Sequence, residues 1–92
     1  MEVRLDGRYL EEPDAAHVYL AEKLDLPEYY GGNLDALYDC LTEISEKMHL
    51  VIVLTGESAN SSYLRRLLAV MRDAEEENRF LKMDVEVLQE VQ

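Results

Sequence analysis

The sequence predicts an α/β fold in which a three-stranded parallel sheet carries its helices mainly on one face. Short apolar segments at the start, middle and end of the chain are typical of strands, and the longer segments between them repeat apolar residues at helical spacing. Helical crossovers between strands imply parallel pairing with right-handed connections. The middle segment is apolar on both faces, whereas the outer two alternate, so it belongs in the centre of the sheet.

The first segments are a strand and a helix. Val3 and Leu5 alternate with charged residues, which predicts a strand with one buried face that closes at Asp6–Gly7. Pro13–Asp14 opens a helix. Its core-facing residues recur every four positions and are Ala16, Leu20 and Leu24.

The second helix follows a loop. Pro27 interrupts the helical pattern, and the segment from Pro27 to Gly32 is expected to be irregular. Asn33 suits the N-cap of the next helix. The apolar stripe of that helix, spaced by three and four, consists of Leu34, Leu37, Leu41 and Ile44.

The C-terminal half predicts strand, helix and strand. Leu50–Leu54 forms the central strand, whose second face needs some cover. A polar linker, 57–62, leads into an amphipathic helix that ends at the acidic run 75–77, which we expect to be solvated. The core-facing residues are Leu64, Leu67, Leu68 and Met71 in this helix, and Leu81, Met83, Val85 and Val87 in the last strand.

The length and the net charge of the chain limit the functions it can have. The 92 residues predict one domain, residues 1–92, with a small core and little room for a deep enzyme cavity. Twenty acidic residues against nine basic ones give a net charge of −11, which disfavours nucleic acid and anionic membranes and favours a cationic partner.

The cellular location follows from weaker signals. Cys40 is the single cysteine, so an internal disulfide is excluded and a reducing compartment is consistent. The chain has no apolar run long enough to span a membrane, and its N-terminus does not resemble a signal peptide. We therefore expect a cytoplasmic protein.

Two carboxylates share one face of the second helix. Asp35 and Asp39 are four residues apart and lie within about 40° of each other around the axis. Thr42 lies on the same face and Tyr38 at its border. Like charges at this spacing destabilise an isolated helix by roughly 0.2–0.5 kcal/mol, so the pair is either an ordinary solvated surface or a surface with a function.

The loop before this helix favours a function. Tyr29 and Tyr30 belong to a residue type enriched in binding hot spots, although we expect at least one of them to pack into the core with its hydroxyl at the surface. Gly31–Gly32 allows close approach of a partner backbone. Together with the aspartates, this composition suits a protein partner that has a cationic site.

The segment LPEYYGGNLDALYDCLT, residues 26–42, is similar to the signature of the barstar family, intracellular inhibitors of secreted bacterial ribonucleases. The segment 70–74 resembles a family segment that holds a further acidic contact. The resemblance implies a barstar-like fold for the whole chain. It also implies a monomer when free, which forms a 1:1 complex with a basic, extracellular-type, barnase-like ribonuclease.

The resemblance further implies a mechanism in which carboxylates occupy the positions of RNA phosphates in the active-site groove of the nuclease. Asp39 is then the principal phosphate mimic, Asp35 either pairs with another cationic group or receives hydrogen bonds at the rim, and Tyr29 packs on the catalytic histidine. The contact is completed by Gly31, Asn33, Leu34, Tyr38, Thr42, Ile44 and Asp73. Tyrosine and isoleucine at 38 and 44, where the family often has tryptophan, point to a changed target preference.

Three alternative functions would use some of the same residues. An acid–base pair of Asp35 and Asp39 is disfavoured because both lie on one convex face, and neither His17, expected at a helix surface, nor His49, expected at a strand entrance, completes a catalytic set. A metal site is disfavoured because no Cys/His cluster or calcium loop is present. The remaining alternative is an acidic adaptor for a different basic protein. We therefore expect no catalytic residues, no metal and no cofactor.

Overall fold

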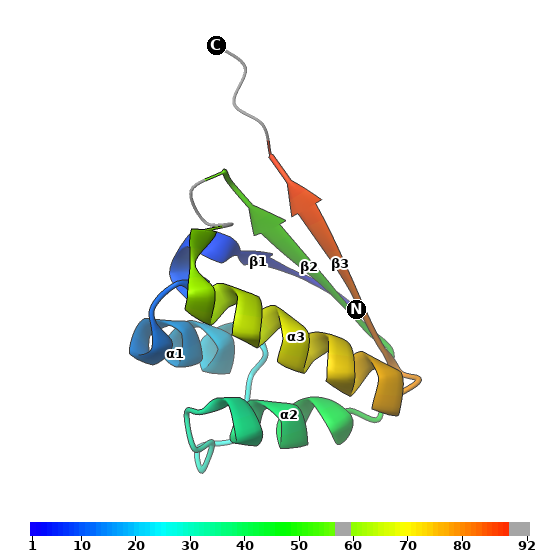
Figure 1. Ribbon diagram of the computed structural model, residues 1–92. Coiled ribbons are helices and arrows are strands. Elements are labelled where there is room, and N and C mark those ends of the chain that lie inside the picture. The colour runs from blue at the N-terminus through cyan, green and yellow to red at the C-terminus, as the bar shows by residue number, and fades with distance from the viewer. Residues whose placement is uncertain (57–59, 89–92) are drawn as a thin grey trace.

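The computed structural model describes residues 1–56 and 60–88. Figure 1 shows one sheet with all the helices gathered on one side of it. In chain order the elements are β1 (Glu2–Asp6), the 3₁₀ helix η1 (Gly7–Leu10), α1 (Pro13–Lys23), α2 (Leu34–Thr42), β2 (Met48–Leu54), α3 (Ser62–Glu77) and β3 (Leu81–Val87). The sheet is parallel in the order β1-β2-β3. The predicted fold class is confirmed.

The core lies between the sheet and the helices. In the register of the sheet, Leu50 of β2 stands between Val3 and Met83, and Ile52 stands between Leu5 and Val85. The helices face this layer with fully or almost fully buried residues, which are Ala16 and Leu20 in α1, Leu37 and Leu41 in α2, and Leu64, Leu67 and Met71 in α3. The apolar spacings in the sequence therefore identified the buried side of each helix.

The arrangement of the helices decides which surface α2 presents. α2 packs along α3, and Figure 1 shows it at the outer edge of the helical layer, away from the strands. Only one side of α2 is therefore covered, and the side that carries its aspartates faces outward.

The second face of β2 is covered by charged side chains of its own sheet. Arg4 of β1 donates to Glu86 of β3 at 2.6 Å, so this ion pair crosses β2. Val51, the β2 residue opposite Arg4, is buried beneath it. His49 of β2 lies 2.6 Å from a carboxylate oxygen of Asp84 and 3.5 Å from one of Glu2. The cover that the central strand requires thus comes from polar side chains of the sheet itself, including the ion pair of Arg4 and Glu86, and not from a second layer of helices or strands.

Two expectations about the C-terminal half are wrong. Val87 is 59% exposed, because the end of β3 extends beyond the helical layer (Figure 1). Glu75 is not part of a solvated run, since its carboxylate accepts the backbone N–H of Met83 at 2.7 Å and so ties α3 to β3. In the predicted linker, residues 57–59 lie outside the described residues, while the Ser61 hydroxyl caps α3 at Leu64.

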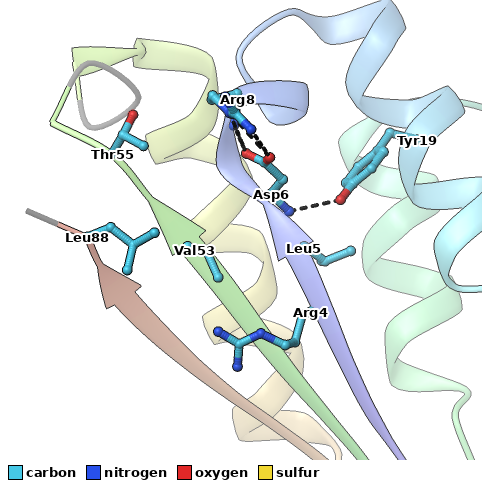
Figure 2. A pocket seen from close by; sticks show the side chains of 8 residues that line it. All are labelled: Arg4, Leu5, Asp6, Arg8, Tyr19, Val53, Thr55 and Leu88. Atoms are coloured by element: carbon cyan, nitrogen blue, oxygen red, sulfur yellow. Dashed lines mark hydrogen bonds and ion pairs between the residues drawn. The ribbon is translucent and has the colours of Figure 1, made fainter. Parts of the chain in front are cut away.

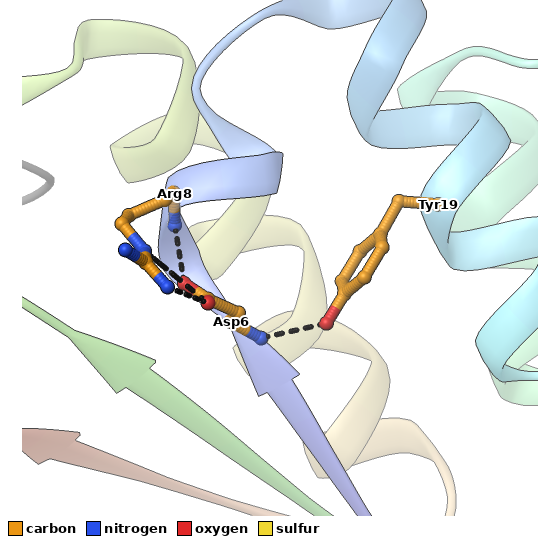
Figure 3. A network of polar contacts seen from close by, with 3 residues as sticks. All are labelled: Asp6, Arg8 and Tyr19. Atoms are coloured by element: carbon orange, nitrogen blue, oxygen red, sulfur yellow. Dashed lines mark hydrogen bonds and ion pairs between the residues drawn. The ribbon is translucent and has the colours of Figure 1, made fainter.

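A cavity of about 440 Å³ lies at the carboxyl ends of β1 and β2 (Figure 2). Its arginines are already engaged within the fold, Arg4 with Glu86 and Arg8 with Asp6. The Arg8 guanidinium donates twice to the Asp6 carboxylate, at 2.7 and 3.1 Å, and holds the pKa of Asp6 below its usual value. The Tyr19 hydroxyl accepts the backbone N–H of Asp6 at 2.9 Å (Figure 3). This network fixes the turn after β1.

The turn after β1 also requires a glycine. A Cβ on Gly7 would lie 2.6 Å from Cδ2 of Leu54 and 2.9 Å from the Val53 carbonyl oxygen. Within the described residues, no helix is long and apolar enough to cross a membrane.

Candidate functional site

The loop before α2 is shaped by a tight turn and two glycines. The Tyr30 N–H donates to the Pro27 carbonyl at 2.9 Å, which closes a turn around Glu28 and Tyr29. The Tyr29 side chain projects from this turn and is 85% exposed. Gly32 has a φ of 68°, a conformation that glycine adopts without strain. The loop therefore presents one large aromatic side chain to solvent.

Asn33 starts α2 as the sequence predicts. Its side-chain oxygen accepts the backbone N–H of Ala36 at 2.8 Å, which satisfies one of the free donors of the first turn. Gly31 packs closely against this cap, since a Cβ there would lie 3.4 Å from the Ala36 Cβ. Asp35 stands in the first turn, where the helix dipole favours a negative charge.

The three carboxylates among the predicted contacts, Asp35, Asp39 and Asp73, are exposed, and we call them the acidic face. Among the ion pairs of residues 1–56 and 60–88, none includes a member of the acidic face. The packing of α2 on α3 places both Asp39 and Asp73 close enough to Tyr38 to influence its hydroxyl. Elsewhere in the described part of the chain other carboxylates do form ion pairs, such as Glu86 with Arg4.

The pKa of the Tyr38 hydroxyl reflects the negative charges around it. Its pKa is raised by partial burial and then by the carboxylates of Glu77, Asp73 and Asp39. Negative potential therefore concentrates where α2 meets the C-terminal half of α3. Glu77 belongs to this cluster, but we missed it in the sequence, because its position beside Tyr38 depends on how two helices pack.

The remaining predicted contacts are half-buried. Leu34, Tyr38 and Ile44 pack against the core, and Thr42 donates its hydroxyl back to the Asp39 carbonyl at 3.0 Å. Ile44 lies beyond the end of α2, where Asn78 donates its side-chain amide to the Ile44 carbonyl at 2.9 Å.

The structure thus distributes the ten predicted contact residues over three neighbouring segments. The loop carries Tyr29, Gly31 and Asn33, the helix α2 and its C-terminal extension carry Leu34, Asp35, Tyr38, Asp39, Thr42 and Ile44, and α3 carries Asp73. Because α2 and α3 pack against each other, these segments form adjoining surface. Their role as partner contacts stays a prediction.

Reactive or metal-binding groups are not gathered here. Burial raises the pKa of the Cys40 thiol, and nearby Glu43 and Asp39 raise it further, which disfavours the nucleophilic thiolate. The part of the chain that the structure describes contains no group of three or more His, Cys, Asp or Glu side chains arranged to hold a metal ion.

The expectation for His17 is wrong. It is 4% exposed, because it lies three residues before Leu20 and shares the buried side of α1. Its ring nitrogens lie 2.5 Å from the hydroxyls of Tyr30 and Tyr63. The expectation that a loop tyrosine keeps its hydroxyl at the surface also fails for Tyr30, whose hydroxyl points inward to His17. His49 does lie near the start of β2, as expected.

Comparison with known proteins adds independent information. A family model described as "Barstar (barnase inhibitor)" matches residues 1–89. A protein of Bacillus subtilis (strain 168) named "Putative ribonuclease inhibitor YrdF" is 41% identical over 76 residues, which cover 79% of this chain and 84% of that protein.

Proposed function

The chain belongs to the barstar family, and from this premise we propose that it inhibits a barnase-like ribonuclease by inserting its acidic face and the loop before α2 into the cationic active site. Membership of the family places the chain among proteins that bind and inhibit a ribonuclease, and not among enzymes. The proposal adds the surface that does so and the way it acts.

The observation that carries the proposal is the unpaired state of the acidic face. Like charges held close together on one surface destabilise the free protein, and none of the ion pairs among the described residues includes one of these carboxylates. Cationic side chains of a nuclease would supply the missing charges. Hydrogen bonds between such ionised groups are shorter and stronger than those between neutral groups.

In the proposed complex, Asp39 takes the position of an RNA phosphate against arginine, lysine and histidine side chains of the nuclease. Asp35 and Asp73 bind further cationic groups on either side. Tyr29, held away from the protein by its turn, packs its ring on the catalytic histidine. The exposed backbone at Gly31 and the amide of Asn33 complete the contact, in a complex of one inhibitor with one nuclease.

A titration tests the proposal. We expect the wild-type protein to abolish the RNA-cleaving activity of a barnase-like ribonuclease at a molar ratio of one to one, and the Asp39→Ala variant to inhibit far less. An adaptor for another basic protein predicts a different result, in which the nuclease retains full activity at any excess of the wild-type protein.

A further inference from the structure

One buried polar cluster is not used by the proposed contact. The imidazole of His17, in α1, lies between the hydroxyls of Tyr30, in the loop, and Tyr63, in α3. Nδ1 faces Tyr30 and Nε2 faces Tyr63, each at 2.5 Å. The three side chains thus join the loop before α2 to the preceding helix, α1, and to α3, which is remote from the loop in sequence.

We propose that His17 is a positioning residue that holds residues 27–33, here called the recognition loop, in the conformation that binds the partner. The proposal rests on the proposed function only in assigning the loop to the nuclease contact. Its structural part, that the cluster holds the loop in place, is independent of any partner.

The sides of the recognition loop show why it needs such a tether. A cavity of about 410 Å³ lies on one side, lined by His17, Val18, Tyr30 and the two glycines among others. A second cavity, of about 320 Å³, is lined by Asn33 to Asp35 together with Tyr63 and Arg66. Because Gly31 and Gly32 have no side chains to pack, Tyr30 is the residue of the recognition loop that reaches inward.

The chemistry of imidazole makes the two contacts interdependent. A neutral ring has one N–H donor and one acceptor nitrogen, so one tyrosine hydroxyl accepts a hydrogen bond while the other donates one. Removal of either hydroxyl leaves a ring nitrogen without its partner in a buried site, which is costly. The charged groups nearby are Asp14 on α1 and Arg66, whose guanidinium lies 5.9 Å from the centre of the Tyr63 ring.

Burial also keeps the three groups neutral. It lowers the pKa of His17, although Asp14 partly opposes the shift, and it raises the pKa values of Tyr30 and Tyr63. Neutral partners suit the donor and acceptor pattern described above. The position of Tyr29, next to Tyr30 in the chain, therefore depends on a hydrogen bond made on the opposite side of the loop.

Single hydroxyl deletions test the tether with little disturbance of packing. Tyr63→Phe removes one hydrogen bond to His17 and lies outside the recognition loop. Tyr19→Phe is the matched control, because it removes a hydroxyl that bonds the Asp6 backbone elsewhere in the fold (Figure 3). The first readout is hydrogen exchange of the Tyr30 and Ala36 amides in the free protein, both of which are hydrogen-bonded. The second is the dissociation rate of the complex with a barnase-like ribonuclease.

We expect Tyr63→Phe to accelerate exchange at Tyr30 and Ala36 about fivefold to tenfold, as the loss of one buried hydrogen bond allows, and to speed dissociation to a similar extent. Tyr19→Phe should lower overall stability but leave both readouts within about twofold of wild type. The double variant Tyr30→Phe/Tyr63→Phe should be non-additive, because both hydroxyls act through one ring.

The inference is overturned if Tyr63→Phe lowers the free energy of unfolding as much as Tyr19→Phe does, while the amide hydrogens of Tyr30 and Ala36 still exchange at the wild-type rate. Additive effects of the two hydroxyl deletions would overturn the interdependence as well. If the wild-type protein does not inhibit the nuclease at all, the proposed function fails, but the exchange experiment still decides whether His17 holds the recognition loop.

Discussion

Carboxylates on the outer face of the sheet have partners within the protein, whereas those of the acidic face on the helical layer form no ion pair among the described residues. On the sheet, Glu86 is paired with Arg4, and Asp84 lies against His49. On the helices, Asp35, Asp39 and Asp73 are exposed and form none of the ion pairs found among the described residues.

This difference separates two uses of charge. On the sheet, the long side chain of Arg4 crosses the central strand, so the ion pair also covers the apolar residue beneath it. On the helices, Asp39 and Asp73 add to the rise that burial causes in the pKa of Tyr38, and Asp35 and Asp39 repel each other across one helical turn, with no such gain to the fold. A surface that keeps an unfavourable charge arrangement is a candidate for binding, because a partner with the opposite charge relieves it.

The largest expected effect is on binding, and it appears when one carboxylate of each face is replaced by alanine in separate variants. Asp39→Ala should weaken binding to a barnase-like ribonuclease by about 10²- to 10⁴-fold, since removal of one member of a buried ion pair costs about 3–5 kcal/mol. Asp84→Ala, on the sheet, should leave binding unchanged. Isothermal titration or inhibition kinetics would measure both.

The Asp39→Ala variant, although it weakens binding, should not lose stability. Asp39→Ala should leave the free energy of unfolding unchanged or raise it by about 0.2–0.5 kcal/mol, through the loss of repulsion with Asp35. A marked loss of stability in this variant would show that Asp39 serves the fold, and the distinction between the two faces would not hold.

A second comparison concerns the rate of association. We expect association to slow at least about tenfold when the salt concentration rises from about 50 to about 500 mM, because screening shortens the range of attraction. The double variant Asp35→Asn/Asp73→Asn should flatten this dependence in stopped-flow experiments. The double variant Glu2→Gln/Asp84→Asn changes net charge equally, and an equal flattening would show that only total charge matters.

The pH dependence of stability distinguishes the buried His17 from Asp6 at the end of β1. Burial lowers the pKa of His17 in the folded protein, so the unfolded chain binds more protons as the pH falls below about 6.5. Stability should therefore decrease from about pH 7.5 to about pH 5, and less so in His17→Gln. Asp6, whose pKa is lowered by Arg8, contributes stability that is lost only at lower pH, below about 4. Urea unfolding at a series of pH values measures both windows, and identical pH profiles for wild type and His17→Gln would contradict this expectation.

The smallest effect is expected for the ion pair on the sheet. Glu86→Gln should change the free energy of unfolding by about 0–1 kcal/mol, as is usual for exposed pairs. Arg4→Ala should cost more, because its methylene groups cover apolar surface of β2. Chemical denaturation distinguishes the two, and equal losses would indicate that charge alone matters there.

The sequence predicted those parts of the fold that depend on local periodicity. Alternation in β1 and β3, the uniformly apolar β2 and the helical stripes gave the sheet and the helix faces, and Asn33 signalled the start of α2. The burial of His17 and the hydrogen bond that the Met83 N–H donates to Glu75 escaped prediction, because their partners are remote or belong to another element. Tyr63, for example, is 46 residues from His17.

The candidate site divides in the same way. Its loop and its α2 residues are contiguous, so a family resemblance in one short segment was enough to propose them. The cluster around Tyr38 joins that segment to Asp73 and Glu77 of α3, and only the packing of two helices brings them together. Residues that act from another element, such as Tyr63, need the three-dimensional structure to be recognised at all.

The most direct test of the central claim, that carboxylates take the positions of RNA phosphates, is a competition between the inhibitor and RNA for the nuclease. Initial rates measured at several RNA concentrations should show competitive inhibition, with the apparent inhibition constant rising linearly with the RNA concentration. A maximal rate that falls with inhibitor, at an unchanged Michaelis constant, would show that RNA and inhibitor bind together and would contradict the claim.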